Sequence, residues 1–166
     1  DGTDSPLTVL FPGLDSTKEE MFAYESSLLE RGIATLTVDG PGQGETWSEH
    51  RMSPEYWRFI ADVLDHVEAQ DHEGLDTTRI GTLGQSLGGY YAPHVAANDD
   101  RVMAWVGISG PFTVGPVSHW GFDLAREQFL HACQTDDMAE VDEISDNMSL
   151  RDDIDDLTVP SVFITG

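Results

Sequence analysis

The chain has 166 residues, a single cysteine, and 31 acidic against 8 basic residues, for a formal net charge of −23. The length suits one domain, whose usual size is roughly 100–150 residues, and the lone Cys133 excludes an internal disulfide. Such a charge repels nucleic-acid phosphates and anionic membranes, so we expect neither as a partner.

The basic residues are unusual in kind, because Lys18 is the only lysine and the other seven are arginines. Acids spread along the whole chain indicate adaptation to molar salt, where carboxylates retain water and salt screens their repulsion. The alternative is an ordinary acidic cytosolic protein. No run approaches the ~20 apolar residues of a membrane span and no signal peptide is visible. We therefore expect a cytoplasmic protein of a halophilic archaeon. Because the chain begins at Asp1 without a methionine, we expect further natural sequence before it.

Apolar runs alternate with helix-period segments along the chain, which is typical of an α/β fold with a mostly parallel sheet. Strands are predicted over residues 7–11 and 33–38. The helix between them begins at Ser16 or Thr17, with Glu19 or Glu20 three residues on in a capping-box pattern. A further helix begins at Ser53-Pro54, and its apolar residues share one face: Trp57, Ile60, Leu64 and Val67.

The second half of the chain predicts strands over 79–83, 102–108 and 161–165. A helix follows the first of these and runs to Ala97, and two more helices are predicted over 122–133 and 138–147. We expect residues 1–110 to form the first part of the core, 111–157 a cap-like insertion, and 158–166 a returning core strand. Aromatic residues favour a cap with an apolar underside over a long acidic crossover: Phe112, Trp120, Phe122 and Phe129.

The strongest chemical motif is Gly84-Gln85-Ser86-Leu87-Gly88, which matches G-x-S-x-G between a predicted strand and a predicted helix. A nucleophile on so tight a turn requires small neighbours two residues away, and Gly84 and Gly88 supply them. The turn would lift Ser86 above the sheet, at a helix N-terminus that favours developing negative charge. The alternative is a glycine-rich turn with an ordinary N-cap serine.

The segment after the first strand, Phe11 to Thr17, is the second candidate. An acyl-transfer site takes one oxyanion donor from the N–H after the nucleophile, here Leu87, and another from this loop. We assign the second donor to Leu14, because Pro12-Gly13 turns the chain just before it. Asp15 faces the pocket or caps the following helix.

The glycine-rich loop at residues 39–45 lacks the Lys-Ser/Thr of a P-loop and does not fit G-x-G-x-x-G. Its glycines let the backbone turn tightly beside the rim of the site. The acidic run 152–156 lacks the alternating ligands and glycine of a calcium loop, so we expect a solvated turn and no metal site.

Together these segments resemble the α/β-hydrolase fold, and specifically the branch that contains 2,6-dihydroxypseudooxynicotine hydrolase and the fermentation–respiration switch proteins. The resemblance rests on residues 12–20, 39–45 and 84–89. It covers residues 5–110 well, thins through the insertion and returns at 159–166.

The resemblance implies Ser86 as nucleophile, followed in chain order by an acid and a histidine. Both are expected beyond Gly166, and strands at both ends of the family's sheet also fall outside the chain. The residues proposed for a substrate pocket are Asp15, Gln85 and Trp120. His119 is the best internal substitute for the missing base. His94 is expected to point away from the nucleophile, His50 to lie in a rim loop, and His66 and His72 to face solvent.

These features predict a serine hydrolase of an ester, thioester, amide or carbon–carbon bond next to a carbonyl, working through an acyl-enzyme without a cofactor. Its partner would be a small-molecule substrate, with a homo-oligomer left open. The alternatives are a non-catalytic regulatory or binding protein on the same scaffold, and an acyltransferase. The segment 1–166 alone is expected to be inactive.

Overall fold

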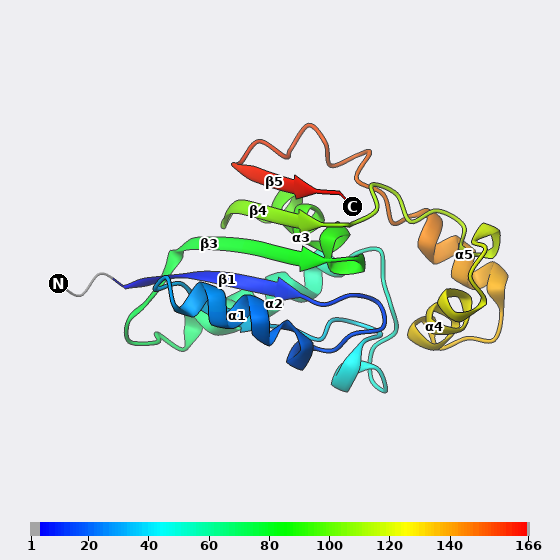
Figure 1. The fold of residues 1–166 in the computed structure, drawn as a ribbon, viewed down its shortest axis with the longest axis horizontal. Coiled ribbons are helices and arrows are strands. Elements are labelled where there is room, and N and C mark those ends of the chain that lie inside the picture. The colour runs from blue at the N-terminus through cyan, green and yellow to red at the C-terminus, as the bar shows by residue number, and fades with distance from the viewer. Residues whose placement is uncertain (1–3, 166) are drawn as a thin grey trace.

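A computed structural model describes residues 4–165, and its centre is one parallel five-stranded sheet in the order β2-β1-β3-β4-β5 (Figure 1). The predicted α/β class with a parallel sheet is therefore confirmed. All the strand arrows run in one direction, so the loops that follow the strands gather at one edge. The strands are β1 (Ser5–Phe11), β2 (Ala34–Thr37), β3 (Leu75–Gln85), β4 (Val102–Ile108) and β5 (Ser161–Ile164).

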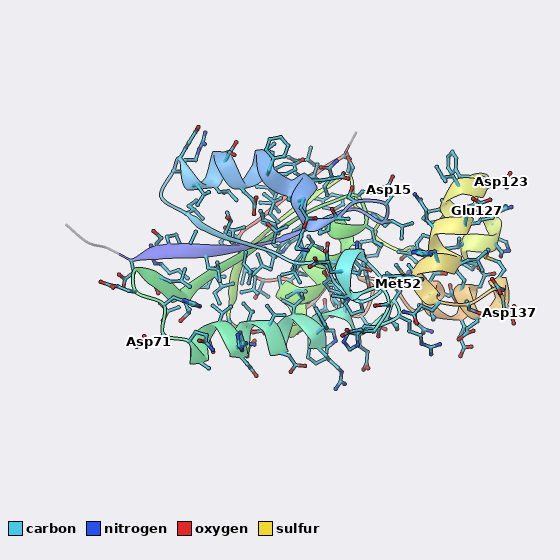
Figure 2. All side chains as sticks on the ribbon, turned by 90° about the horizontal axis from the view of Figure 1, so that it is seen from below. Asp15, Met52, Asp71, Asp123, Glu127 and Asp137 are labelled. Atoms are coloured by element: carbon cyan, nitrogen blue, oxygen red, sulfur yellow. The ribbon has the colours of Figure 1, made fainter. Side chains whose placement is uncertain are left out.

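Helices cover both faces of the sheet. On one face lies α1 (Phe22–Leu29), and on the other lie α2 (Tyr56–Ala69) and α3 (Leu87–Asn98), as Figure 2 shows for α1 and α2. The exposed side of α2 carries the acids Asp62, Asp65 and Glu68, and Asp71 follows just after the helix (Figure 2). No helix within residues 4–165 is both long and apolar enough to cross a membrane.

Several predicted boundaries differ from the structure, and three of them have a clear physical reason. β3 begins at Leu75 rather than at residue 79, because Leu75 and Asp76 already pair with the start of β1. The helix after β1 starts as a 3₁₀ turn, Lys18–Met21, whose N-cap Thr17 makes no side-chain capping bond, so the capping box is not formed. α2 starts at Tyr56 because Ser53 accepts the Glu55 N–H in a local turn, 3.1 Å.

The core is built on aromatic contacts between α2, α3 and β1. Tyr56 is fully buried, stacks on Tyr91 with centroids 3.7 Å apart and meets Phe11 edge-on at 5.6 Å. Of the predicted apolar face of α2, Ile60 and Leu64 are also fully buried, and its other two residues are half-buried. At about 1.5–3 kcal/mol for each buried large side chain, this face ties α2 firmly to the sheet.

Residues 112–150 form a small helical unit beyond the C-terminal ends of the strands (Figure 1). It contains a 3₁₀ turn (Val117–His119), α4 (Asp123–Cys133) and α5 (Met138–Asp146), which pack on one another. Its entry and exit are joined, because the Val114 N–H donates to Met148 O at 2.9 Å and the Leu150 N–H donates to Phe112 O at 3.0 Å. The unit leaves and re-enters the core at one point, directly above the edge where the strands end.

Candidate active site

Ser86 occupies the turn between β3 and α3, with φ 56° and ψ −121°. A non-glycine residue in this region carries strain of about 1–3 kcal/mol, which persists only where the surroundings enforce it. Here they do: the Ser86 N–H donates to Ile108 O of β4 at 2.8 Å, and the Ser86 carbonyl accepts the Gly89 N–H at 2.8 Å. The side chain is exposed at the strand edge, as a nucleophile requires.

Gly84 and Gly88 are sterically required for this turn. A Cβ on Gly84 would lie 1.9 Å from the Gly88 carbonyl oxygen, and a Cβ on Gly88 would lie 2.1 Å from Phe11 O. Both obstacles are backbone atoms, so no side-chain movement can relieve the clash. The small residues predicted on either side of Ser86 are those that the backbone geometry demands.

The loop after β1 lies directly against Ser86. A Cβ built on Gly13 would be 3.3 Å from Ser86 Cβ, so the Gly13–Leu14 peptide borders the site. No acceptor for the Leu14 N–H is found among residues 4–165. Leu87 is the first residue of α3, and amides in the first helical turn have no partner within the helix. The two amides assigned as oxyanion donors thus lie in the loop and the helix terminus that meet at Ser86.

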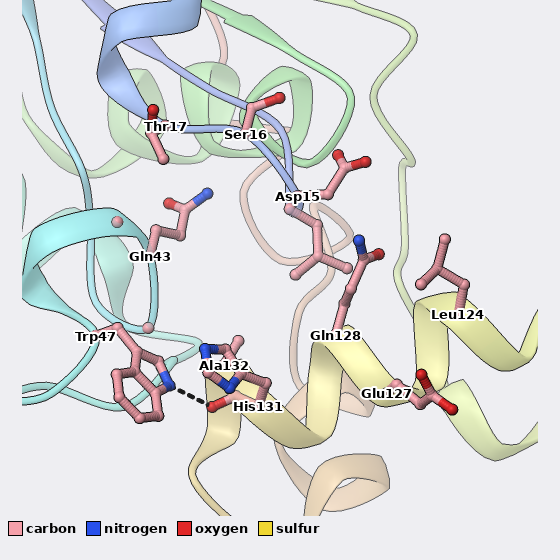
Figure 3. Close-up of a pocket in the computed structure, with 13 residues that line it drawn as sticks. Asp15, Ser16, Thr17, Gln43, Trp47, Leu124, Glu127, Gln128, His131 and Ala132 are labelled. Atoms are coloured by element: carbon pink, nitrogen blue, oxygen red, sulfur yellow. Dashed lines mark hydrogen bonds between the residues drawn. The ribbon is translucent and has the colours of Figure 1, made fainter.

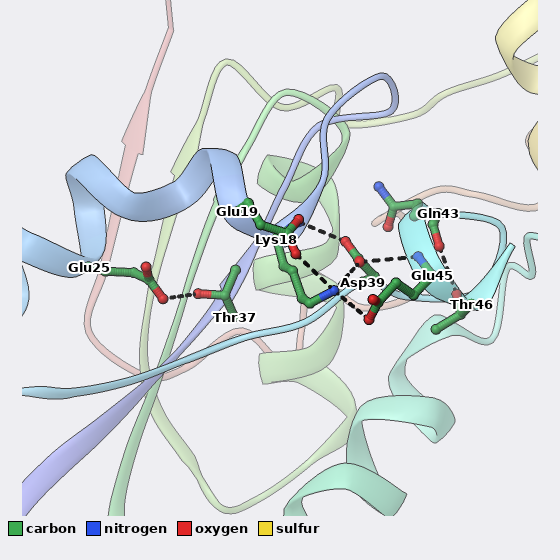
Figure 4. Close-up of polar contacts among 8 residues, drawn as sticks. All are labelled: Lys18, Glu19, Glu25, Thr37, Asp39, Gln43, Glu45 and Thr46. Atoms are coloured by element: carbon green, nitrogen blue, oxygen red, sulfur yellow. Dashed lines mark hydrogen bonds and ion pairs between the residues drawn. The ribbon is translucent and has the colours of Figure 1, made fainter.

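Lys18 clamps the two loops beside the site together (Figure 4). Its Nζ lies 3.0 Å from Asp39 Oδ2 and 2.7 Å from Glu45 Oε2, while its backbone N–H donates to Asp39 Oδ1 at 2.7 Å. Hydrogen bonds to Glu45, Asp39 and Glu19 raise the pKa of Lys18 above its ordinary value. The single lysine of the chain therefore joins the loop after β1 to the loop after β2.

An open cleft of about 430 Å³ lies between these loops and α4 (Figure 3). Asp15 and Leu14 line one side, and residues of α4 such as Gln128 line the other. Trp47 lies on the cleft wall, stacked on His131 with centroids 4.2 Å apart. The cleft is where the helical unit faces the loop that carries the Leu14 amide.

Of the three proposed pocket residues, only Asp15 lines this cleft. Gln85 instead accepts a hydrogen bond from the Tyr24 hydroxyl at 2.8 Å. Trp120 packs edge-on against Phe129 with centroids 5.4 Å apart, inside the helical unit. Short-range sequence reasoning could not foresee the Gln85–Tyr24 contact, because the two residues are 61 positions apart.

Residues 5–156 match the sequence family described as serine aminopeptidase, S33, within the α/β-hydrolases. The chain belongs to this family. The strained serine turn, its two glycines and the loop after β1 are therefore those of an α/β-hydrolase.

Named relatives agree with this family. The chain is 32% identical over 164 residues to 2,6-dihydropseudooxynicotine hydrolase of Paenarthrobacter nicotinovorans. This match covers 97% of this chain and 43% of the relative. The solved structure of the 2,6-dihydroxy-pseudo-oxynicotine hydrolase matches with a TM-score of 0.87 at 31% identity, over 98% of this chain and 46% of that one. Est1E of Butyrivibrio proteoclasticus, solved with ferulic acid, shares the fold at a TM-score of 0.72 and 22% identity, over 96% of this chain and 68% of that one. The chain thus spans less than half of the first two relatives.

The histidines of this α/β-hydrolase chain make other contacts than with Ser86. No hydrogen bond from a histidine to Ser86 is found within residues 4–165, and the favoured internal candidate, His119, is exposed on the 3₁₀ turn of the helical unit. His66 and His72 are exposed, as predicted, and so is His50 in the rim loop. The described contacts therefore provide no histidine base for Ser86 within residues 4–165.

His94 points away from Ser86, as predicted, and holds the segment that leaves the helical unit. Its Nδ1 lies 2.6 Å from Asp153 Oδ2 and its Nε2 lies 3.0 Å from Pro54 O. Asn98 donates to the other Asp153 oxygen at 3.0 Å. Burial alone would raise the pKa of Asp153, but the hydrogen bonds from His94 and Asn98 outweigh it and hold that pKa below its ordinary value.

Asp153 corrects one expectation, because the acidic run 152–156 was expected to be wholly solvated. Its first, fourth and fifth residues are exposed, whereas Asp153 is half-buried against α3. Within residues 4–165, no three histidine, cysteine or carboxylate side chains converge in a way that could hold a metal ion.

Proposed function

We propose that the protein containing this chain is a serine hydrolase in which Ser86 attacks a carbonyl carbon of a small-molecule substrate. The observation that carries the proposal is the strained Ser86 turn, whose φ of 56° is enforced by β4 and by glycines with no room for a side chain. Strain of this kind accumulates at functional sites, and a structural turn would have selected glycine at this position.

The reaction follows from the groups around Ser86. Oγ forms a bond to the carbonyl carbon while its proton passes to a base, and the carbonyl oxygen becomes an oxyanion. The Leu14 and Leu87 N–H groups stabilise that oxyanion, each such donor being worth about 10²–10³ in rate. The leaving group departs with a proton, and water then hydrolyses the acyl-enzyme. The resemblance assigns the base and its acid to residues after Gly166.

The bond cleaved is an ester, thioester, amide or carbon–carbon bond next to a carbonyl. The 32% identity to 2,6-dihydropseudooxynicotine hydrolase supports a small organic substrate, and the cleft of about 430 Å³ beside the Leu14 loop can hold one. In this proposal, residues 111–157 act as a cap that selects the substrate, and no cofactor takes part. We also retain a cytoplasmic setting, with no nucleic-acid or membrane partner, as part of this proposal.

A second part of the proposal concerns the charge of −23. Exposed acids surround the helices, and basic partners are few, so most carboxylates repel one another at low ionic strength. We attribute this composition to adaptation to molar salt in a halophilic archaeon rather than to recognition of the substrate.

The test uses the full-length gene product and p-nitrophenyl butyrate, with butyryl thioesters as a second substrate. A hydrolase of this mechanism shows an initial burst of nitrophenol and loses turnover in Ser86→Ala. Addition of competing alcohol or amine acceptors separates an acyltransferase, which would form the transfer product instead of butyrate. Equal turnover in Ser86→Ala would refute Ser86 as the nucleophile. No turnover in either protein, together with an unreactive serine, would favour a non-catalytic protein.

A further inference from the structure

Gln43 is a polar side chain buried between the two loops that border the site. It is 2% exposed, and its Nε2 donates to the carbonyl oxygen of Gly13 at 2.8 Å. Its Oε1 has no hydrogen-bond partner among residues 4–165. A buried glutamine left half-satisfied is costly, which indicates that its one hydrogen bond matters.

The bond to Gly13 fixes a whole peptide unit. In a trans peptide, the C=O of Gly13 and the N–H of Leu14 lie in one plane and point in opposite directions, and no cis peptide occurs in residues 4–165. The Gly13 carbonyl also accepts the Ser16 N–H at 3.3 Å, so two donors hold it. Holding the oxygen toward Gln43 therefore turns the Leu14 N–H away from Gln43.

Gln43 is itself held rigidly. Its N–H donates to Gly40 O at 3.0 Å, and its carbonyl accepts both the N–H and the hydroxyl of Thr46, at 3.0 and 2.9 Å. The Gly42 N–H beside it donates to His50 O at 2.7 Å. At the start of this loop, Asp39 is clamped by Lys18 (Figure 4). These contacts fix the backbone of Gln43, so that its side-chain amide can hold the loop after β1 in one position.

We propose that Gln43 is a positioning residue of the oxyanion hole. Its Nε2 holds the Gly13 carbonyl so that the Leu14 N–H is presented, before substrate arrives, to the oxyanion that forms at Ser86. This inference rests on the proposed serine-hydrolase function. It explains the residue type, because neither an ionised Glu nor Leu can donate to a carbonyl, and either would leave the Gly13 oxygen with only the longer bond from the Ser16 N–H.

The experiment follows the reaction of the full-length gene product with a fluorophosphonate, whose phosphoryl oxygen takes the place of the oxyanion. Gln43→Leu should lower the maximal labelling rate about 10–100-fold, while the concentration for half-maximal rate changes less than about twofold. Gln43→Glu should label slowly at neutral pH and recover relative to the parent as pH falls, because the protonated carboxyl can donate again.

Thr82→Val is the matched control, because it deletes another buried side-chain bond to a carbonyl, from Thr82 Oγ1 to Ala92 O at 2.9 Å. It should lower stability but leave the labelling rate unchanged. A Gln43→Leu protein that labels at the parent rate would overturn the inference. If that variant does not fold, a pH profile of Gln43→Glu parallel to the parent's would overturn it. An unlabelled parent protein would instead remove the proposed function.

Discussion

The strain at Ser86 predicts that glycine is more stabilising than alanine at this position, the reverse of the usual order. Both substitutions remove the nucleophile, so they differ only in the backbone. Glycine relieves strain of about 1–3 kcal/mol at φ 56°, but it loses about 0.5–1 kcal/mol of chain entropy on folding. The balance is about 0–2.5 kcal/mol, and we expect Ser86→Gly to be about 1 kcal/mol more stable than Ser86→Ala.

The matched position is Ser27, an exposed residue within α1 with ordinary helical geometry. There Ser27→Gly should be about 1 kcal/mol less stable than Ser27→Ala, because glycine is a poor helix former. Urea unfolding of the four full-length variants, with circular dichroism as the signal, measures both differences. If alanine were the more stable residue at both positions, the reasoning that Ser86 is held in a strained nucleophile turn would be refuted.

Three further predictions concern packing, pH and salt. Gly84→Ala should destabilise the protein by at least about 2–3 kcal/mol, because the new Cβ would meet backbone 1.9 Å away. Gly121→Ala, which has open space around it, should change stability by no more than about 0.5 kcal/mol. Equal urea midpoints for the two variants would contradict this. Asp153→Asn should cost about 1–2 kcal/mol at neutral pH. Because the folded pKa of Asp153 is lowered, its contribution to stability is present above the unfolded pKa of about 3.9 and fades as pH falls through the folded value. The loss of stability in Asp153→Asn should therefore vanish in acid. The exposed Asp155→Asn should show no such pH trend. Thermal melting should shift upward from dilute buffer to about 3 M KCl as the carboxylates are screened, and an unchanged melting temperature would contradict salt adaptation.

The sequence predicted the elements that depend on local pattern. The serine turn, β4 and the buried face of α2 follow from motifs and periodicity within a dozen residues, and the structure has them at those positions. The fold class followed from the alternation of these elements. The tight turn at Ser86 could be predicted because its steric requirement, a glycine two residues away on each side, can be read directly in the neighbouring sequence.

Contacts between distant segments could not be predicted in the same way. Gln43 donates to Gly13 across 30 residues, and His94 meets Asp153 across 59. In the sequence, Gln43 was only one letter of a glycine-rich loop, and Asp153 one of four acids in a run of five. A buried polar partner is identified by its surroundings, which exist only after β1 and β2 have been paired.

The most direct test of the central claim is covalent labelling of the full-length protein with a fluorophosphonate, followed by peptide mass spectrometry. The strained turn and the two amides that have no hydrogen-bond partner among residues 4–165 predict one adduct, on Ser86, that is absent from Ser86→Ala. An adduct that persists in Ser86→Ala, or a folded parent protein that stays unlabelled, would contradict the assignment of Ser86 as the nucleophile.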